Sequence, residues 1–200
     1  MSCFQTIIVH ISGPSGSGKS TLGIKIAESF PSTTVAVKDT DEFIQDGNPE
    51  SDELLRLEKL HEGRENKEYI EYWRNIWDHS ISDFIISNEN KLIVFVGLTD
   101  NCGPPYHYYN INQAHYRFYI KIDKKELLKR YYTRFIEDTK TKPVWEEIIQ
   151  QRRVVCSSYD IIGPSFEKER DWHHKNGYNI NDETKIMEDI KIIFENTFNS

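Results

Sequence analysis

A glycine-rich segment near the start of the chain carries the residues best suited to chemistry. Residues 13–20 read Gly-Pro-Ser-Gly-Ser-Gly-Lys-Ser and fit the pattern G-x-x-x-x-G-K-[ST] without deviation. In such a segment the glycines let successive backbone N–H groups point at phosphate oxygens, and the N-terminus of the next helix adds a positive dipole end. The residues predicted to hold a phosphorylated nucleotide are Gly13, Pro14, Ser15, Gly16, Ser17, Gly18, Lys19, Ser20 and Thr21.

Three side chains in this segment have separate predicted roles. Lys19 would reach the β- and γ-phosphates, and the Ser20 hydroxyl would hold Mg²⁺. Thr21 would begin the helix and contact the α-phosphate. The motif therefore predicts ATP and Mg²⁺ as the ligands.

The elements on either side of the motif have the form that it requires. Thr6–Ile11 is a short β-branched run typical of a buried strand. After the glycines, Leu22, Ile26 and Phe30 recur at every fourth position, which indicates a helix that Pro31 ends. A strand, a glycine-rich turn and a helix thus follow one another in the expected order.

Further strands and helices alternate along the chain. The pattern predicts strands at Thr33–Val37, Leu92–Val96, Tyr116–Ile122 and Tyr178–Ile180, with helices over residues 51–63, 66–87, 123–137, 143–157 and 183–198. Residues 158–176 are too polar for an assignment, and His173 and His174 are expected to face solvent. Trp73 and Trp77, at helical spacing, are expected in the core. The alternation predicts an α/β fold with a parallel sheet and helices on both faces.

Composition limits the class of protein. The 200 residues suit one globular domain, and a formal net charge of −7 disfavours a nucleic-acid binder that coats phosphates. The apolar runs fall far short of the ~20 residues that span a bilayer, so no membrane partner is expected. Three cysteines without C-x-x-C spacing, and no basic segment before the first apolar run, predict a reducing, cytoplasmic location. The oligomeric state is left open.

The chain resembles the small-molecule and nucleotide kinases of the phosphate-loop (P-loop) class, the group of shikimate kinases and nucleoside monophosphate kinases. The resemblance rests on residues 13–20, on Asp39-Thr40-Asp41 after the second strand, and on an arginine-bearing helix before a polar segment. It implies a three-layer α/β/α P-loop NTPase fold with a five-stranded parallel sheet in the order 2-3-1-4-5. It also implies one kinase domain over residues 1–200, with a helical acceptor-binding insertion at about 42–88 and a lid at about 134–153.

The resemblance implies roles for particular acids and for one glycine. Asp39 would hold the hydration shell of Mg²⁺, and Asp41 would accept a hydrogen bond, and then the proton, from an acceptor hydroxyl. Gly97 matches the glycine-rich end of the third strand in shikimate kinases, beside the acceptor. The alternative for Asp39 and Asp41 is a turn acid followed by a helix N-cap.

Arginines are assigned by the same resemblance. Arg130 and Arg134 lie four residues apart on one helix face and would close over ATP, stabilising charge on the moving phosphoryl group. Arg64 in the helical insertion, and Arg152 or Arg153 after the lid, would bind the acceptor. The alternative for each is an ordinary solvated or salt-bridged helix charge, for example with Glu126.

Three functions are consistent with these residues. The first is an ATP-dependent kinase that phosphorylates a hydroxyl of a metabolite or nucleoside, which the paired aspartates favour. The second is a nucleoside or deoxynucleoside monophosphate kinase, which the arginine-bearing insertion favours. The third, of another class, is an ATP-binding regulator or a kinase of nucleic-acid 5′ ends, against which the acidic net charge argues.

Overall fold

The computed structural model describes residues 5–14, 16–43, 67–97, 111–130, 133 and 159–198. Its centre is a five-stranded sheet in which every pair of neighbouring strands is parallel and the order is β2-β3-β1-β4-β5. The strands are β1 (Ile7–Ser12), β2 (Val35–Asp39), β3 (Leu92–Val96), β4 (Tyr116–Ile120) and β5 (Asn179–Asn181). The α/β class, the parallel sheet and its order are those predicted from the sequence.

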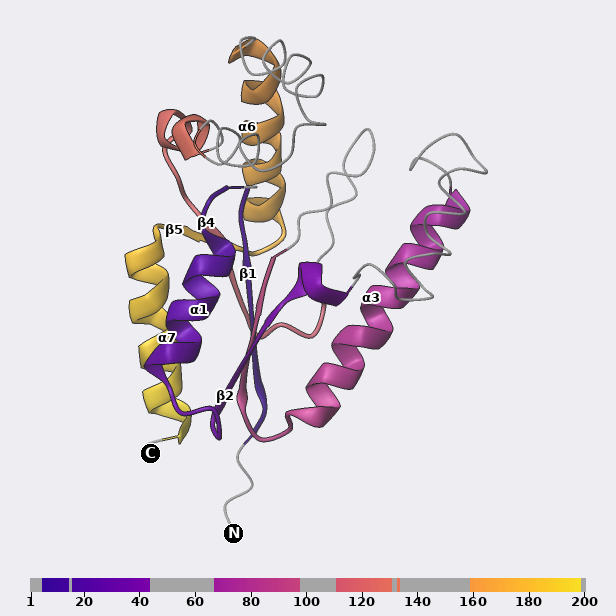
Figure 1. Ribbon diagram of the computed structural model, residues 1–200, viewed down its shortest axis with the longest axis vertical. Helices are drawn as coiled ribbons and strands as arrows, with labels where there is room; N and C mark the ends of the chain where they lie inside the picture. The colour runs from indigo at the N-terminus through magenta and orange to yellow at the C-terminus, as the bar shows by residue number, and fades with distance from the viewer. Residues whose placement is uncertain are drawn as a thin grey trace.

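Helices cover both faces of this sheet (Figure 1). They are α1 (Lys19–Ser29), α3 (Lys67–Ser87), α6 (Tyr159–Lys175) and α7 (Glu183–Phe198), with a short 3-10 helix η1 (Thr40–Phe43) and a helical turn sequence at 124–130. Figure 1 shows α1 and α7 together on one face and α3 on the other. It also shows α6 at the end of the sheet where β1 finishes.

The core fills the space on both sides of β3. On the α3 face, Ile76, Trp77 and Ile81 are buried together with Ile93 and Phe95. On the opposite face, α1, α7 and the alternate strand positions bury Leu22, Ile26, Val94, Val96, Ile186 and Ile190. Burial on both faces explains why the strand sequence is an uninterrupted apolar run instead of an alternating one. The expected core position of Trp77 is confirmed, whereas the side chain of Trp73 lies outside the described residues.

The second strand begins two residues later than predicted. The N–H groups of Thr34 and Val35 both donate to the carbonyl oxygen of Pro31, at 2.9 and 3.0 Å, so a turn takes up the start of the predicted strand. At its other end the strand continues until Asp39, which pairs with Val96 of β3. Asp39 is therefore the last residue of the strand and not a residue beyond it, which anchors its backbone in the sheet.

The polar stretch left unassigned in the sequence is the helix α6. Among its described side chains, residues 167–175, the buried ones are Glu169 and His173, which are 4% and 0% exposed. A search for apolar periodicity misses this segment because both of its buried positions are polar. The expectation that His173 faces solvent is wrong, whereas His174 is exposed as expected.

None of the helices within the described ranges is both long enough and apolar enough to cross a membrane.

Candidate functional site

The glycine-rich segment forms a tight loop between β1 and α1. Gly16 and Gly18 have φ angles of +77° and +100°, in the left-handed region that L side chains rarely adopt. The N–H of Ser17 closes a turn by donating to the carbonyl oxygen of Pro14 at 3.0 Å. Ser15 lies outside the described residues. The loop thus has the backbone shape that glycine alone permits at these positions.

The first turn of α1 can receive a negatively charged group. Gly18 is the N-cap residue and makes no side-chain cap, and the first turn carries no acidic side chain. The first N–H groups of a helix have no partner within it, and the helix dipole places partial positive charge there. Together these features make the start of α1 a potential anion site, with Ser20 and Thr21 exposed beside it.

Lys19 lies on the inner side of the loop. Its ammonium group donates to the carbonyl oxygens of Gly13 and Pro14, at 2.7 and 3.1 Å. These contacts fold the side chain back over the loop and not out into solvent. The positive charge of Lys19 is therefore held at the loop, beside the start of α1.

Ser20 and Asp39 are brought together from two different elements. The Ser20 hydroxyl donates to Oδ2 of Asp39 at 2.6 Å, although the residues are 19 positions apart. The other carboxylate oxygen of Asp39 accepts a hydrogen bond from the backbone N–H of Asp41 at 3.1 Å. The sheet order makes this possible, because the carboxyl ends of parallel strands lie at one edge. The two predicted metal ligands are thus neighbours.

A pocket of about 530 Å³ opens beside the loop. Its volume lies within the usual range for small-molecule sites. The pocket brings predicted site residues from the loop, η1 and the helical 124–130 segment to one place; its lining is Gly16, Gly18, Lys19, Ser20, Thr21, Lys25, Asp41, Arg130 and Glu183. Lys25 and Glu183 form an ion pair with each other, so the other charged residues of the lining are the basic Lys19 and Arg130 and the acidic Asp41.

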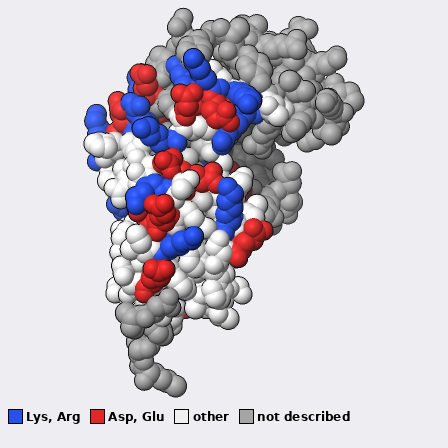
Figure 2. Space-filling view, turned by 90° about the vertical axis from the view of Figure 1, so that its left-hand side faces the viewer, with Lys and Arg blue, Asp and Glu red and all other residues white. Residues whose placement is uncertain are grey.

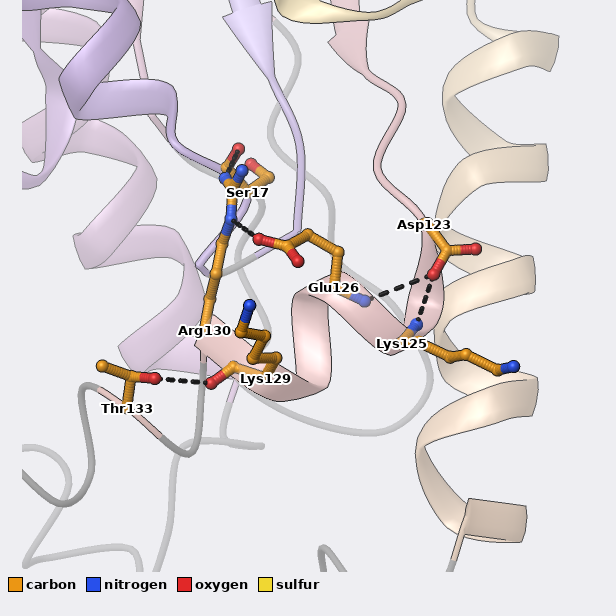
Figure 3. A network of polar contacts seen from close by, with 7 residues as sticks. All are labelled: Ser17, Asp123, Lys125, Glu126, Lys129, Arg130 and Thr133. Carbon is orange, nitrogen blue, oxygen red and sulfur yellow. Dashed lines mark hydrogen bonds and ion pairs between the residues drawn. The ribbon is translucent and has the colours of Figure 1, made fainter.

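Arg130 joins the helical 124–130 segment to the loop (Figure 3). Its guanidinium donates to the carbonyl oxygen of Ser17 at 3.1 Å and pairs with Glu126 at 3.0 Å. Asp123 caps the segment by accepting from the N–H groups of Lys125 and Glu126, at 2.8 and 3.2 Å. Arg130 therefore has both the helix ion pair and a contact with the loop, and it lines the pocket.

Gly97 directly follows β3 and lies beside Asp39 and Thr40. Its φ angle is +123°, and a β-carbon there would lie 2.4 Å from Oγ1 of Thr40 and 3.1 Å from Oδ1 of Asp39. Both features require glycine at this position. Gly97 thus lies beside Asp39 in the structure. Its predicted role in binding an acceptor stays a prediction.

We expect Gly97→Ala to disturb the site as well as the fold. The added methyl group must displace Thr40 or Asp39, and the left-handed backbone adds strain. Loss of about 1–3 kcal/mol of unfolding free energy is expected, measured by urea denaturation. Gly177→Ala is the matched control, because Gly177 also has a positive φ but its β-carbon would meet only Arg117, at 4.0 Å. Equal losses in the two variants would contradict steric exclusion at Gly97.

Several predicted site residues lie outside the described part of the chain. These are Ser15 of the loop, Arg64 of the helical insertion, and Arg134, Arg152 and Arg153 of the lid region. Their roles stay predictions. Residues 44–66 of the predicted insertion and the predicted lid, at about 134–153, also lie outside the described residues.

The sequence analysis missed a group of buried polar side chains behind the loop. His10 lies within β1, is fully buried, and approaches the carbonyl oxygen of Gly97 at 3.3 Å and the Tyr178 hydroxyl at 2.7 Å. Ser12 lies 2.9 Å from Nε2 of the buried His173. The available signal was a histidine inside an otherwise apolar strand, which indicates a buried polar partner.

Both buried histidines are neutral near pH 7. The pKa of His10 is lowered to about 3, mainly by burial; the bond to the Gly97 carbonyl opposes this, while the nearby His173, Arg117 and Lys19 act in the same direction as burial. Burial likewise lowers the pKa of His173 to about 4, with Lys19 acting in the same direction. Burial also raises the pKa of Tyr178, so its hydroxyl stays protonated. The group is thus uncharged at physiological pH.

We expect acid to destabilise the protein from about pH 6.5 downwards. The unfolded histidines take up protons near pH 6.5, whereas the folded ones resist until about pH 4 and 3. The contribution of these histidines to the free energy of unfolding is therefore fully present above pH 6.5. It falls with decreasing pH by up to about 1.4 kcal/mol per pH unit for each proton that the unfolded state takes up. Urea denaturation between pH 5 and 8 measures this slope. His173→Gln should reduce it and the exposed His174→Gln should not; an unchanged slope in both would contradict the assignment.

Two oxygen donors, from Ser20 and Asp39, are available at the predicted metal position. In the ranges that the structure describes, no group of three or more His, Cys, Asp or Glu side chains is arranged to hold a metal ion. A site completed by protein side chains alone is therefore not formed by these residues. Mg²⁺ normally uses one or two carboxylates and takes its other ligands from water and substrate phosphates.

The chain matches none of the protein-family models and none of the curated proteins with which it was compared. The features that bear on function come from the structure itself. They are the loop before α1, the hydrogen bond between Ser20 and Asp39, and the pocket that Ser20 and the loop line together with Asp41 and Arg130.

Proposed function

We propose that the chain is an ATP-dependent kinase of the P-loop class, which transfers the γ-phosphoryl group to a hydroxyl of a small-molecule acceptor. The observation that carries the proposal is the hydrogen bond of 2.6 Å from Ser20 to Asp39. It joins the last residue of the G-x-x-x-x-G-K-S loop to the acid that ends β2. Asp39 also accepts a hydrogen bond from the N–H of Asp41, and Asp41 lines the same pocket as Ser20.

Binding of the triphosphate is supported by the charges around the loop. The N–H groups at the start of α1, the Lys19 ammonium and the Arg130 guanidinium all border one pocket. These are the kinds of donor that hold phosphate oxygens, and they come from elements fixed by the sheet. A polyphosphate placed there would come within reach of the Lys19 ammonium, which the carbonyl oxygens of Gly13 and Pro14 hold at the loop.

The residues present fit Mg²⁺. Ser20 and Asp39 offer a hydroxyl and a carboxylate oxygen, the ligands that this hard cation prefers. Asp39 would act directly or through a water molecule, and its orientation is fixed by the N–H of Asp41. When bound, Mg²⁺ neutralises charge on the phosphates and orients them.

The chain's own residues account for the remaining steps of transfer. Lys19 and Arg130 would stabilise the charge that spreads over the transferring group, which is where electrostatic stabilisation contributes most. Asp41 would orient the acceptor hydroxyl and take its proton as the new phosphate ester bond forms. ADP is the leaving group, so one P–O bond is broken for each one formed.

A hydroxyl acceptor is favoured over a phosphate acceptor by Asp41. A phosphate acceptor is already ionised, so a carboxylate in the pocket would repel it, whereas a hydroxyl benefits from a base.

The distribution of charge on the surface also supports a small-molecule acceptor over a nucleic acid. On the face shown in Figure 2, acidic side chains are interspersed among the basic ones, so this face has no continuous basic surface for nucleic acid.

The metal role of Asp39 provides the test of this proposal. In Asp39→Asn the rate of phosphoryl transfer should fall at least about tenfold at low Mg²⁺ and recover partly as Mg²⁺ is raised, because the variant binds the ion more weakly. The measurement is initial rate against Mg²⁺ concentration at saturating ATP. Asp41→Asn is the control, since its defect should not respond to Mg²⁺. A magnesium dependence of Asp39→Asn equal to that of the wild type would contradict the assigned role.

A further inference from the structure

A cluster of buried polar side chains lies behind the glycine-rich loop and does not line the pocket. We call His10, Ser12, His173 and Tyr178 the buried cluster; the first three are 0% exposed and Tyr178 is 3% exposed. Its members come from β1, from the last turn of α6 and from the turn before β5. The cluster therefore joins the strand that enters the loop to a helix more than 140 residues further along the chain.

The hydrogen bonds determine which atoms of His173 carry the proton. Nδ1 lies 2.8 Å from the carbonyl oxygen of Glu169, and a carbonyl can only accept, so Nδ1–H is the donor. In a neutral imidazole the other nitrogen is then an acceptor. The Ser12 hydroxyl, 2.9 Å from Nε2, must therefore donate to it. The lowered pKa of His173, about 4, maintains this arrangement at neutral pH.

The His173 ring is closely surrounded by other aromatic rings. Its centroid lies 4.5 Å from that of Tyr119, 4.7 Å from that of Tyr178 and 5.0 Å from that of Trp172. The carbonyl oxygen of His173 also accepts from the N–H of Tyr178 at 3.0 Å. Rings packed in this way leave few alternative rotamers, so Nε2 is a fixed acceptor for Ser12.

Ser12 is the last residue of β1 and is followed directly by Gly13. The carbonyl oxygen of Gly13 accepts from the Lys19 ammonium at 2.7 Å. A β-carbon on Gly13 would lie 3.2 Å from that of Ile120, so the backbone at Gly13 packs closely against the end of β4. The hydroxyl of Ser12 is thus held one residue before the backbone that positions Lys19.

We propose that His173 is a positioning residue of the kinase: by accepting a hydrogen bond from Ser12, it fixes the exit of β1 and thereby the placement of Lys19. The assignment rests on the proposed function, because Lys19 is the residue through which it affects transfer. His173 does not line the pocket and has no direct part in the chemistry. Through His173, α6 helps to position the catalytic lysine as well as packing at the end of the sheet.

Two substitutions of the same residue separate this role from simple packing. His173→Gln keeps an acceptor near the position of Nε2 and can still bond to Ser12, whereas His173→Asn reaches only the position of Nδ1 and loses Ser12. We expect His173→Asn to lower kcat by about 10–100-fold while ATP affinity changes less than about threefold, because a displaced Lys19 matters most in the transition state. His173→Gln should restore kcat to within about threefold of the wild type.

The experiment measures kcat by ADP release and ATP affinity by calorimetry, with His174→Gln as the exposed neighbouring control. Circular dichroism reports whether each variant is folded. Equal kcat values for folded His173→Asn, His173→Gln and wild type would overturn the positioning role and leave the proposed function intact. A wild-type protein that fails to bind Mg-ATP would overturn the proposed function and this assignment with it.

A second variant covers the case in which His173→Asn does not fold. Ser12→Ala removes the donor with little change in volume and should lower kcat about as much as His173→Asn. In any folded double variant of Ser12→Ala with His173→Gln, the rescue by glutamine should disappear, because its partner is gone. Normal kcat in folded Ser12→Ala would overturn the proposal.

Discussion

Lys19→Ala is expected to reduce phosphoryl transfer to near background, with kcat lower by at least about a hundredfold. The ammonium group is held at the loop by the carbonyl oxygens of Gly13 and Pro14 and lines the pocket. Its loss removes a positive charge from the position where transition-state charge develops. The side chain belongs to neither hydrophobic core, so the melting temperature should change little.

Initial rates of ADP formation at saturating ATP measure this effect. Lys185→Ala is a suitable control, because Lys185 is an exposed lysine of α7 that pairs with Asp189 and does not line the pocket. Turnover by Lys19→Ala at the wild-type rate, with the control also normal, would contradict phosphate binding at the loop.

Asp41→Asn is expected to lower kcat by at least about a hundredfold while leaving ATP affinity nearly unchanged. The change keeps the size and hydrogen-bonding reach of the side chain but removes the basic oxygen. A hydroxyl has a pKa far above neutrality, so a positioned carboxylate can contribute roughly 10²–10⁴-fold by accepting its proton. The reaction is followed with a hydroxyl acceptor at saturating ATP.

The adjacent Glu42 provides a matched control for Asp41. Glu42 is an exposed acid of the same 3-10 helix, and its carboxylate pairs with Lys38 instead of lining the pocket. Glu42→Gln should retain the wild-type kcat. Near-normal turnover by Asp41→Asn on a nucleoside monophosphate would contradict a hydroxyl acceptor and favour the monophosphate kinase alternative.

The parts of the fold that follow from local pattern were predictable. The strand Leu92–Val96 and the helix Glu183–Phe198 have the predicted bounds, because a run buried on both faces and an amphipathic stripe are both local signals. The strand order is the one that the resemblance implied. Ser20 and Asp39, both predicted at the metal position, are hydrogen-bonded to each other. In a parallel sheet, residues that follow different strands gather at one edge whatever their separation in sequence.

Partners without a local pattern were not predictable. Ser12 and His173 are 161 residues apart, and their hydrogen bond depends on how α6 lies against the end of the sheet. The buried side chains in the described part of α6, residues 167–175, are the polar Glu169 and His173, so this sequence does not resemble that of a helix packed on a core. The position at which β2 begins likewise depends on a turn, in which the carbonyl oxygen of Pro31 accepts two N–H groups.

The central claim is that the pocket transfers phosphoryl groups from ATP to a hydroxyl. The most direct measurement is phosphorus NMR of the wild-type protein with ATP and Mg²⁺, with separate panels of nucleosides, sugars, hydroxy acids and nucleoside monophosphates as acceptors. The account predicts ADP together with an equal amount of a new phosphate monoester from a hydroxyl acceptor, and no such product with Lys19→Ala. A new diphosphate formed from a nucleoside monophosphate, or no transfer to any acceptor, would contradict it.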